Sequence, residues 1–121
     1  MDVDSKSILQ LSEELTILSE NARSGQLKPS DLKGGTFTIS SLGGIGGSFF
    51  TPIINPPEVA ILGVSKSRWE QVFDPKSKEP ALRYIMPFSL SYDHRIIDGA
   101  AGARFTTELK KTIEELGFLS K

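Results

Sequence analysis

The sequence predicts a single α/β or α+β domain, in which a mixed sheet carries helices on one side. Three observations indicate this class. A helical apolar period occurs near each end of the chain, short alternating or wholly apolar segments lie between, and 121 residues suit one small domain. This order of helix, strands and helix favours a two-layer arrangement, because a sheet and an amphipathic helix each have an apolar face to bury.

The first helix is expected over residues 7–25. Its apolar residues recur at spacings of three and four, which places them on one helical face. They are Ile8, Leu11, Leu15, Leu18 and Ala22. Gly25 supplies the stop signal.

Strands are expected in three later segments. Residues 36–41 alternate polar and apolar side chains, which is typical of a half-buried strand. Residues 59–65 form a near-continuous apolar run, which is typical of a strand buried on both faces. Residues 81–92 form either one strand or two strands that break at Pro87, and residues 74–80 are predicted to be a turn-rich loop.

The last helix is expected from about Asp98 to Leu116. Its apolar stripe again has helical spacing. The stripe consists of Ala101, Phe105, Leu109, Ile113 and Leu116. Phe118 and Leu119 follow close to the end of the chain, either as an apolar anchor for another subunit or as a frayed end.

Composition excludes several classes of function. The net charge is −1 with both signs interspersed, so no basic surface for nucleic acid is expected. The absence of cysteine excludes disulfides, zinc-thiolate sites and a cysteine nucleophile, and a single histidine argues against a metal site. No apolar run is long enough for a transmembrane helix.

Glycines and serines surround the first predicted strand. Six of the eleven glycines fall between residues 34 and 47. The segment lacks the Gly-Lys-Ser/Thr of a phosphate-binding loop and the third glycine of a dinucleotide fingerprint. It is therefore predicted to be a tight loop that allows close approach of backbone, with a phosphate cradle as the alternative. Ser40 and Ser41 end the strand beside it, as turn formers or as a nucleophile or oxyanion donor.

The segment "SYDHRIIDG", residues 91–99, contains the only histidine. His94 is expected in a strand-to-helix turn, where catalytic groups are common, and imidazole suits proton transfer near neutral pH. The alternative is a structural histidine. Asp98 is the expected N-cap of the last helix. Asp93, Arg95 and Asp98 could also form an ion network that sets the imidazole tautomer and stabilises its protonated form.

The longer segment "SYDHRIIDGAAGARF" resembles the histidine signature of the dihydrolipoamide acyltransferases, the E2 cores of the 2-oxo-acid dehydrogenase complexes. "GGTFTISSLGGIGGSFFTPIINPPEVAILGVSKS" is similar to the segment that precedes this signature in the family, and the two motifs agree in order and distance. The resemblance covers nearly the whole chain and looks most like the pyruvate-type acetyltransferases of bacteria. It implies a chloramphenicol-acetyltransferase-like fold.

The resemblance implies roles for three residues. His94 matches the catalytic histidine, Asp98 the aspartate of the same motif, and Ser40 the hydroxyl residue of the family's strand, with Ser41 as the alternative if the alignment shifts by one. It implies acetyl transfer between a dihydrolipoyl thiol and coenzyme A. His94 would act as general base, and Ser40 of a neighbouring subunit would stabilise the tetrahedral oxyanion. Serine at position 40, where succinyl-transferring relatives are expected to carry threonine, favours an acetyl group.

The resemblance also implies the cofactors and partners. Coenzyme A would be a substrate, the lipoyl group would be carried by a separate lipoyl domain, and no metal would be needed. Homotrimers would build a larger core that binds the E1 and E3 components, in the bacterial cytoplasm or the mitochondrial matrix. Neither nucleic acid nor membrane is an expected partner.

One feature departs from the family: the chain is shorter than its catalytic domain. We therefore expect residues 1–121 to be the C-terminal part of a single acyltransferase catalytic domain, without the lipoyl and peripheral-subunit-binding domains. Much of the coenzyme A pocket and an arginine partner for Asp98 would lie outside it. The alternatives are a non-catalytic scaffold or oligomerisation fragment, another acyl specificity (succinyl or branched-chain), and a chloramphenicol-type acetyltransferase.

Overall fold

The computed structural model describes residues 3–115, which form two compact units, residues 3–35 and 36–115. The first unit holds a short 3-10 helix, Val3–Ser5, and α1, Ile8–Arg23. Ser7 caps α1: its Oγ accepts from the Gln10 N–H at 3.3 Å, and the Gln10 side chain accepts from the Ser7 N–H at 2.8 Å. No residue of α1 is buried, so the predicted apolar stripe is present without forming a core.

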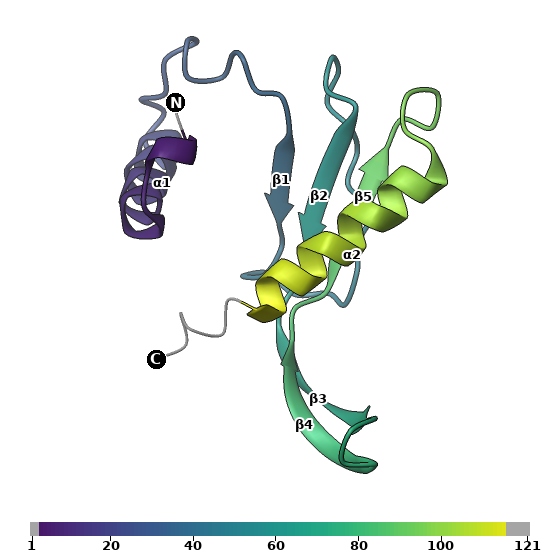
Figure 1. Cartoon of the computed structure of the whole chain (residues 1–121). Coiled ribbons are helices and arrows are strands. Elements are labelled where there is room, and N and C mark those ends of the chain that lie inside the picture. The colour runs from purple at the N-terminus through teal and green to yellow at the C-terminus, as the bar shows by residue number, and fades with distance from the viewer. Residues whose placement is uncertain (1–2, 116–121) are drawn as a thin grey trace. The chain divides into compact units, whose positions relative to one another are not determined.

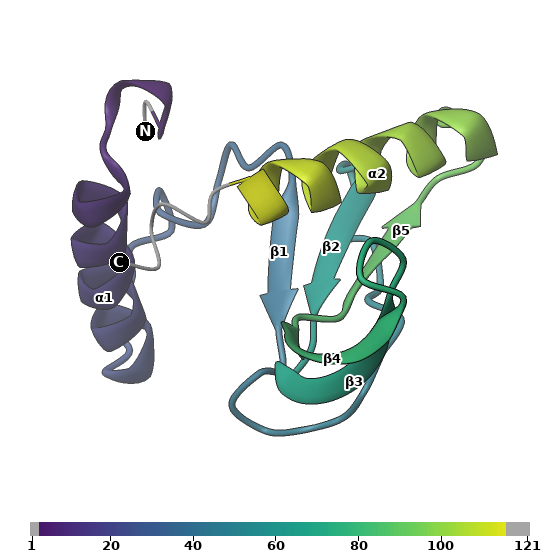
Figure 2. The same ribbon diagram turned by 60° about the horizontal axis from the view of Figure 1, so that its bottom comes forward.

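The second unit contains two sheets and one helix. Three strands, β1 (Thr38–Ser41), β2 (Ala60–Val64) and β5 (Phe88–Tyr92), form a sheet in the order β1-β2-β5. β1 runs parallel to β2, whereas β5 runs antiparallel to it. α2, Gly99–Glu115, lies along one face of this sheet (Figures 1 and 2). The predicted mixed sheet with helical cover on one side is thus confirmed for this unit.

The sheet face under α2 carries large apolar side chains. Tyr92 packs against Gly102 of the helix, and the rings of Phe37 and Phe105 lie 6.0 Å apart. Because side chains alternate along a strand, Leu62 and Leu90, which pair in register, share the face of Tyr92. Three aliphatic residues of β2 are buried, as its apolar run predicts: Ala60, Ile61 and Leu62.

The opposite face of the sheet is covered by the segment that joins β1 to β2. A Cβ atom added at Gly63 would lie 2.9 Å from Cζ of Phe50 and 3.2 Å from Cδ of Pro52. The absence of a side chain at Gly63 therefore lets this segment lie directly on the sheet. At the start of β1, the Thr38 hydroxyl donates to the Glu58 carboxylate at 2.6 Å, which fixes the end of the segment.

The remaining strands form a separate antiparallel hairpin, β3 (Arg68–Asp74) and β4 (Glu79–Ile85). β3 is absent from the prediction, and the predicted loop over residues 74–80 is too long, because β4 already begins at Glu79. Burial alternates along β3, but Trp69 and Phe73, which are more than 60% exposed, lie on its exposed face, whereas its charged residues lie on the half-buried face. Residues 81–92 do contain two strands, which break at Met86 and Pro87 and belong to different sheets.

Replacing Gly102 by alanine is expected to destabilise the fold by about 1–2 kcal/mol. The added Cβ would lie 2.8 Å from Cε1 and 3.0 Å from Cζ of Tyr92, and such overpacking costs about 1–3 kcal/mol, which exceeds the helix propensity that alanine adds. The free energy of urea unfolding measures this change. Ala103→Gly on the exposed side of α2 is the control for propensity alone, with an expected loss of about 1 kcal/mol. A Gly102→Ala protein that is more stable than the parent would contradict the packing.

Candidate active site

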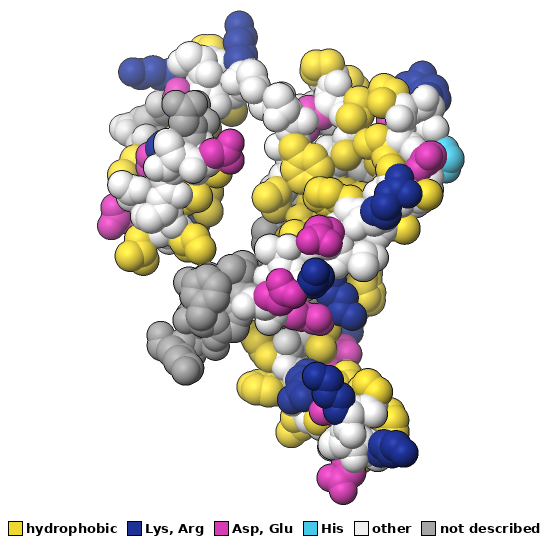
Figure 3. All heavy atoms as spheres, viewed as in Figure 1, with side chains coloured by type: hydrophobic (Ala, Val, Ile, Leu, Met, Phe, Trp, Pro, Cys, Tyr) yellow, Lys and Arg dark blue, Asp and Glu magenta, His cyan; other side chains and the backbone are white. Residues whose placement is uncertain are grey.

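His94 lies where the sequence places it, in the turn between β5 and α2. Its side chain is exposed, and it is the cyan side chain at the surface in Figure 3. The imidazole contacts the ring of Tyr92, with the ring centroids 5.8 Å apart, and its Nε2 lies 3.9 Å from the position that a Cβ of Gly99 would take. Within residues 3–115 the imidazole makes no hydrogen bond, so both nitrogens are available to a substrate.

Asp93 and Arg95, which flank this histidine, form an ion pair. Nη2 and Nε of Arg95 donate to the Asp93 carboxylate at 2.6 and 2.9 Å. The hydrogen bond from the Arg95 side chain, and then that from its backbone, lowers the pKa of Asp93 from 3.8 to about 2. The carboxylate of Asp93 therefore stabilises the folded chain above pH 4, and this contribution is lost as the pH falls towards 2.

Asp98 caps the N-terminus of α2. Its Oδ1 accepts from the Ala101 N–H at 2.6 Å, and its carbonyl accepts from the Gly102 N–H at 3.1 Å. The predicted cap is confirmed. The predicted ion network is wrong in two respects: across the described residues Asp98 has no cationic partner, and no carboxylate contacts the His94 imidazole to set its tautomer. The capping bond instead holds Asp98 on the helix backbone, away from Arg95.

Ser40 and Ser41 differ in what their hydroxyls do. Ser41 turns its Oγ into its own loop, where it accepts from the Gly43 N–H at 3.4 Å. Ser40 points to the opposite face of the sheet, and its Oγ has no partner among the residues that the structure describes. Both hydroxyls keep an O–H proton that can be donated, but the bond from the Gly43 N–H holds the Ser41 oxygen in its own loop, whereas no bond holds the Ser40 oxygen within the described structure. The structure therefore favours Ser40 over Ser41 as the oxyanion donor.

The glycine-rich segment after β1 is a tight turn, as predicted. The N–H groups of Ile45 and Gly46 donate to the Leu42 carbonyl, and Gly46 and Gly47 have φ angles of 132° and 93°, which glycine adopts without strain. Another backbone approaches this segment at Gly43, at an ordinary contact distance: a Cβ added there would lie 3.9 Å from the Ser65 carbonyl oxygen. A Cβ at Gly44, Gly46 or Gly47 would meet no atom within 4 Å.

One chain does not bring Ser40 and His94 together. Ser40 pairs with Gly63, which pairs with Ser89, so Ser40 lies beside the start of β5, whereas His94 follows its end. From Ser89 to Tyr92 the sheet extends about 10 Å along the strands, and the two strand spacings add about 10 Å across them. Ser40 also faces away from α2, whereas the His94 ring lies on the α2 side. A shared site therefore requires Ser40 from a second chain.

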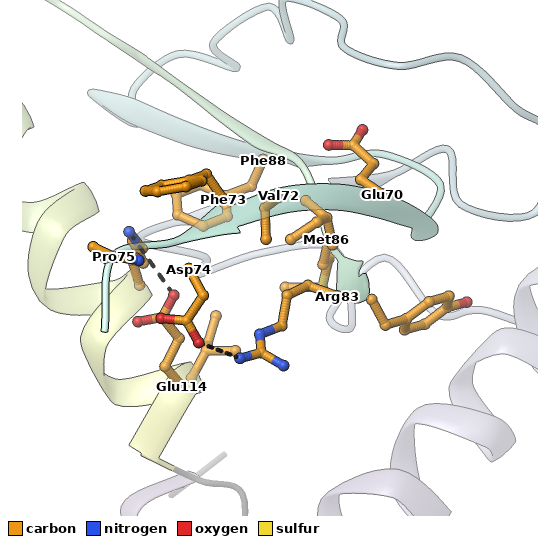
Figure 4. A pocket seen from close by; sticks show the side chains of 13 residues that line it. Glu70, Val72, Phe73, Asp74, Pro75, Arg83, Met86, Phe88 and Glu114 are labelled. Atoms are coloured by element: carbon orange, nitrogen blue, oxygen red, sulfur yellow. Dashed lines mark hydrogen bonds and ion pairs between the residues drawn. The ribbon is translucent and has the colours of Figure 1, made fainter. Parts of the chain in front are cut away.

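A groove of the described structure lies elsewhere. It has a volume of about 810 Å³ and runs between the β3–β4 hairpin and the end of α2 (Figure 4). Its lining includes Val72, Arg83 and Ile113 but none of the three candidate residues. Because Ser40, His94 and Asp98 lie in other parts of the fold, this groove is not part of the candidate active site.

Other sequence-based candidates add nothing to the site. Lys66 is exposed just after β2 and has no bonded partner within residues 3–115, so nothing there links it to the site. Phe118 and Leu119, considered as a subunit anchor, lie outside the described residues. No cluster of metal-ligating side chains occurs in the described part of the chain, and no helix there is long and apolar enough to cross a membrane.

Comparison with known families identifies the class of protein to which this fold and its histidine turn belong. The model of the 2-oxoacid dehydrogenases acyltransferase (catalytic domain) family matches residues 1–120. The chain therefore belongs to this family.

Individual relatives point to one branch. The dihydrolipoyllysine-residue acetyltransferase component of the pyruvate dehydrogenase complex of Buchnera aphidicola subsp. Acyrthosiphon pisum is 54% identical over 118 residues, which is 98% of this chain and 29% of that protein. The dihydrolipoamide acetyltransferase structure of Azotobacter vinelandii superposes with a TM-score of 0.91 at 52% identity, over 99% of this chain and 49% of that chain. The cubic core of a pyruvate dehydrogenase multienzyme complex matches equally well, at 51% identity and a TM-score of 0.91.

These similarities confirm the expected fold, that of the chloramphenicol-acetyltransferase-like E2 catalytic cores. The chain spans about half the length of the solved chains, with 49% covered. The Azotobacter structure was studied for the role of a serine, a histidine and an asparagine in catalysis, and there the asparagine follows the histidine by four positions.

Proposed function

We propose that this chain is the C-terminal part of a catalytic domain that transfers an acetyl group between a dihydrolipoyl group and coenzyme A within a pyruvate dehydrogenase complex. His94 is the general base and Ser40 of a neighbouring subunit is the oxyanion donor. The observation that carries this proposal is the agreement of the His94 turn with the histidine motif of the Azotobacter enzyme. Asp98 follows His94 by four positions, as the asparagine follows the histidine there.

The exchange of aspartate for asparagine supports a definite role for Asp98. Aspartate and asparagine cap helices about equally well through a side-chain oxygen. The bond from the Ala101 N–H to Oδ1 of Asp98 uses such an oxygen and needs no charge. We infer that Asp98 holds the start of α2, and with it the His94 turn, and that its negative charge is not required.

The assignment of Ser40 agrees with the comparison once an insertion is allowed. The catalytic serine of the Azotobacter enzyme precedes the histidine by 52 positions, whereas Ser40 precedes His94 by 54. The intervening segment includes the exposed turn between β3 and β4, and exposed turns accept inserted residues readily. The free Oγ of Ser40 then supports this residue over Ser41.

The chemistry follows from these positions. His94 removes the proton from the thiol of coenzyme A, and the thiolate attacks the carbonyl carbon of the acetyl-dihydrolipoyl thioester. The new C–S bond converts the carbonyl to a tetrahedral oxyanion, to which the Ser40 hydroxyl donates a hydrogen bond worth about 3 kcal/mol. The oxyanion collapses, the C–S bond to the dihydrolipoyl group breaks, and the proton on His94 passes to that leaving thiolate.

Turnover by the intact protein tests the proposal directly. With dihydrolipoamide as acceptor, acetyl-CoA is expected to be a better donor than succinyl-CoA or a branched-chain acyl-CoA by a factor of about 10 or more in kcat/KM, since a mismatch of a few atoms in a pocket is worth about 1–3 kcal/mol. Calorimetric titration with coenzyme A measures binding in parallel. An intact assembly that neither binds coenzyme A nor transfers acetyl would establish a scaffold role instead.

A further inference from the structure

Asp93 ties the turn that carries His94 to the sheet. Its N–H donates to the Val59 carbonyl at 2.8 Å, which joins the end of β5 to the start of β2. Its own carbonyl accepts from the N–H groups of Ile96 and Ile97 at 3.0 and 2.9 Å. The main chain on both sides of His94 is therefore fixed to one residue.

The Asp93 side chain also holds the turn, through Arg95 on the other side of His94. Its Oδ1 accepts from the backbone N–H of Arg95 at 3.0 Å, and both carboxylate oxygens accept from the Arg95 guanidinium. Such a paired, charge-assisted contact has a defined geometry. His94 lies between the two residues that this contact joins, so its backbone has little freedom to rotate.

The imidazole itself contributes no bond to this arrangement. Its ring lies beside that of Tyr92 and near Gly99 at the start of α2. Its position therefore depends on the backbone of the turn. A shift of about 1 Å in a catalytic group can lower turnover by about 100-fold.

We propose that Asp93 is a positioning residue for His94, which sets the direction of the imidazole without touching the substrate. This inference rests on the proposed function. The two aspartates near His94 thus have different roles. Asp98 caps α2, and Asp93 fixes the backbone of His94.

The hairpin offers a matched control. Oδ1 of Asp74 accepts from the backbone N–H of Lys76, two residues later, at 2.8 Å, and Oδ2 accepts from the Arg83 guanidinium at 3.4 Å (Figure 4). The Asp74 and Asp93 side chains are 23% and 20% exposed. Removal of either carboxylate therefore disrupts the same kind of turn, but only Asp93 adjoins His94.

The test compares Asp93→Ala, Asp93→Asn and Asp74→Ala in the intact protein, with kcat and KM for both substrates and sedimentation as readouts. Asp93→Ala is expected to lower kcat by about 10–100-fold with KM changed less than about twofold. Asp93→Asn, whose oxygen still accepts from the Arg95 N–H but which lacks the charge that pairs with the guanidinium, should recover only part of the loss, and Asp74→Ala should keep kcat within about twofold.

The outcomes separate this inference from the proposed function. If His94→Ala abolishes turnover while Asp93→Ala keeps a normal kcat, Asp93 has no positioning role and the proposed function stands. An equal loss of kcat in Asp74→Ala would also overturn the inference. If Asp93→Ala does not assemble, the same comparison is made with Arg95→Ala and its control Arg83→Ala. A normal kcat in Arg95→Ala would then overturn the inference on Asp93. Normal turnover in His94→Ala would overturn the proposed function itself.

Discussion

Replacing His94 by alanine in the intact protein is expected to lower kcat for acetyl transfer by about 10²–10⁴-fold, the usual contribution of a positioned general base. The chain has no second histidine, and the two carboxylates of the turn have other partners: Asp93 accepts from Arg95, and Asp98 accepts from the Ala101 N–H. Because the imidazole is exposed and makes no hydrogen bond within the described structure, its removal should leave the fold unchanged. Steady-state transfer of acetyl to coenzyme A measures the loss.

Assembly is the control for this substitution. Sedimentation of His94→Ala should match that of the parent protein, and its unfolding midpoint should be unchanged. A His94→Ala protein that assembles and retains near-normal turnover would exclude His94 as the base.

Replacing Ser40 by alanine is expected to lower kcat by about 10²–10³-fold with little change in KM, because an oxyanion donor acts in the transition state rather than in the ground state. Ser41→Ala is the matched control. It removes a hydroxyl of the same strand that points to the other face of the sheet and is held in its own loop by the Gly43 N–H, so kcat should stay within about twofold. Steady-state kinetics of both variants decides between the two serines. Loss of activity in Ser41→Ala alone would shift the assignment by one residue.

Local pattern was sufficient to predict most of the elements. The apolar run of β2, the alternation in β1 and β5 and the capped period of α2 all depend on neighbouring residues, and each element is present. β3 was missed because "RWEQVFD" mixes charged and aromatic side chains, and its two aromatic residues stay exposed. Its pairing with β4, rather than burial, stabilises it as a strand.

The site was predictable only in part. His94, Asp98 and Ser40 could be named from motifs, but their spatial relation depends on strand register. The pairing of Ser40 with Gly63 and of Gly63 with Ser89 is a non-local property that no spacing in the sequence encodes. The contribution of Asp93 was overlooked for a similar reason, since its bond to Val59 joins residues that are 34 positions apart.

The central claim is that Ser40 and His94 act together from two different chains. Coexpression of His94→Ala and Ser40→Ala chains with different tags, followed by purification through both tags, tests it most directly. Random association gives about a quarter of the sites an intact His94 and an intact Ser40 from neighbouring chains. The account predicts kcat per site of about a quarter of the parent value, far above either variant alone. A mixed assembly with no more activity than the separate variants would contradict it.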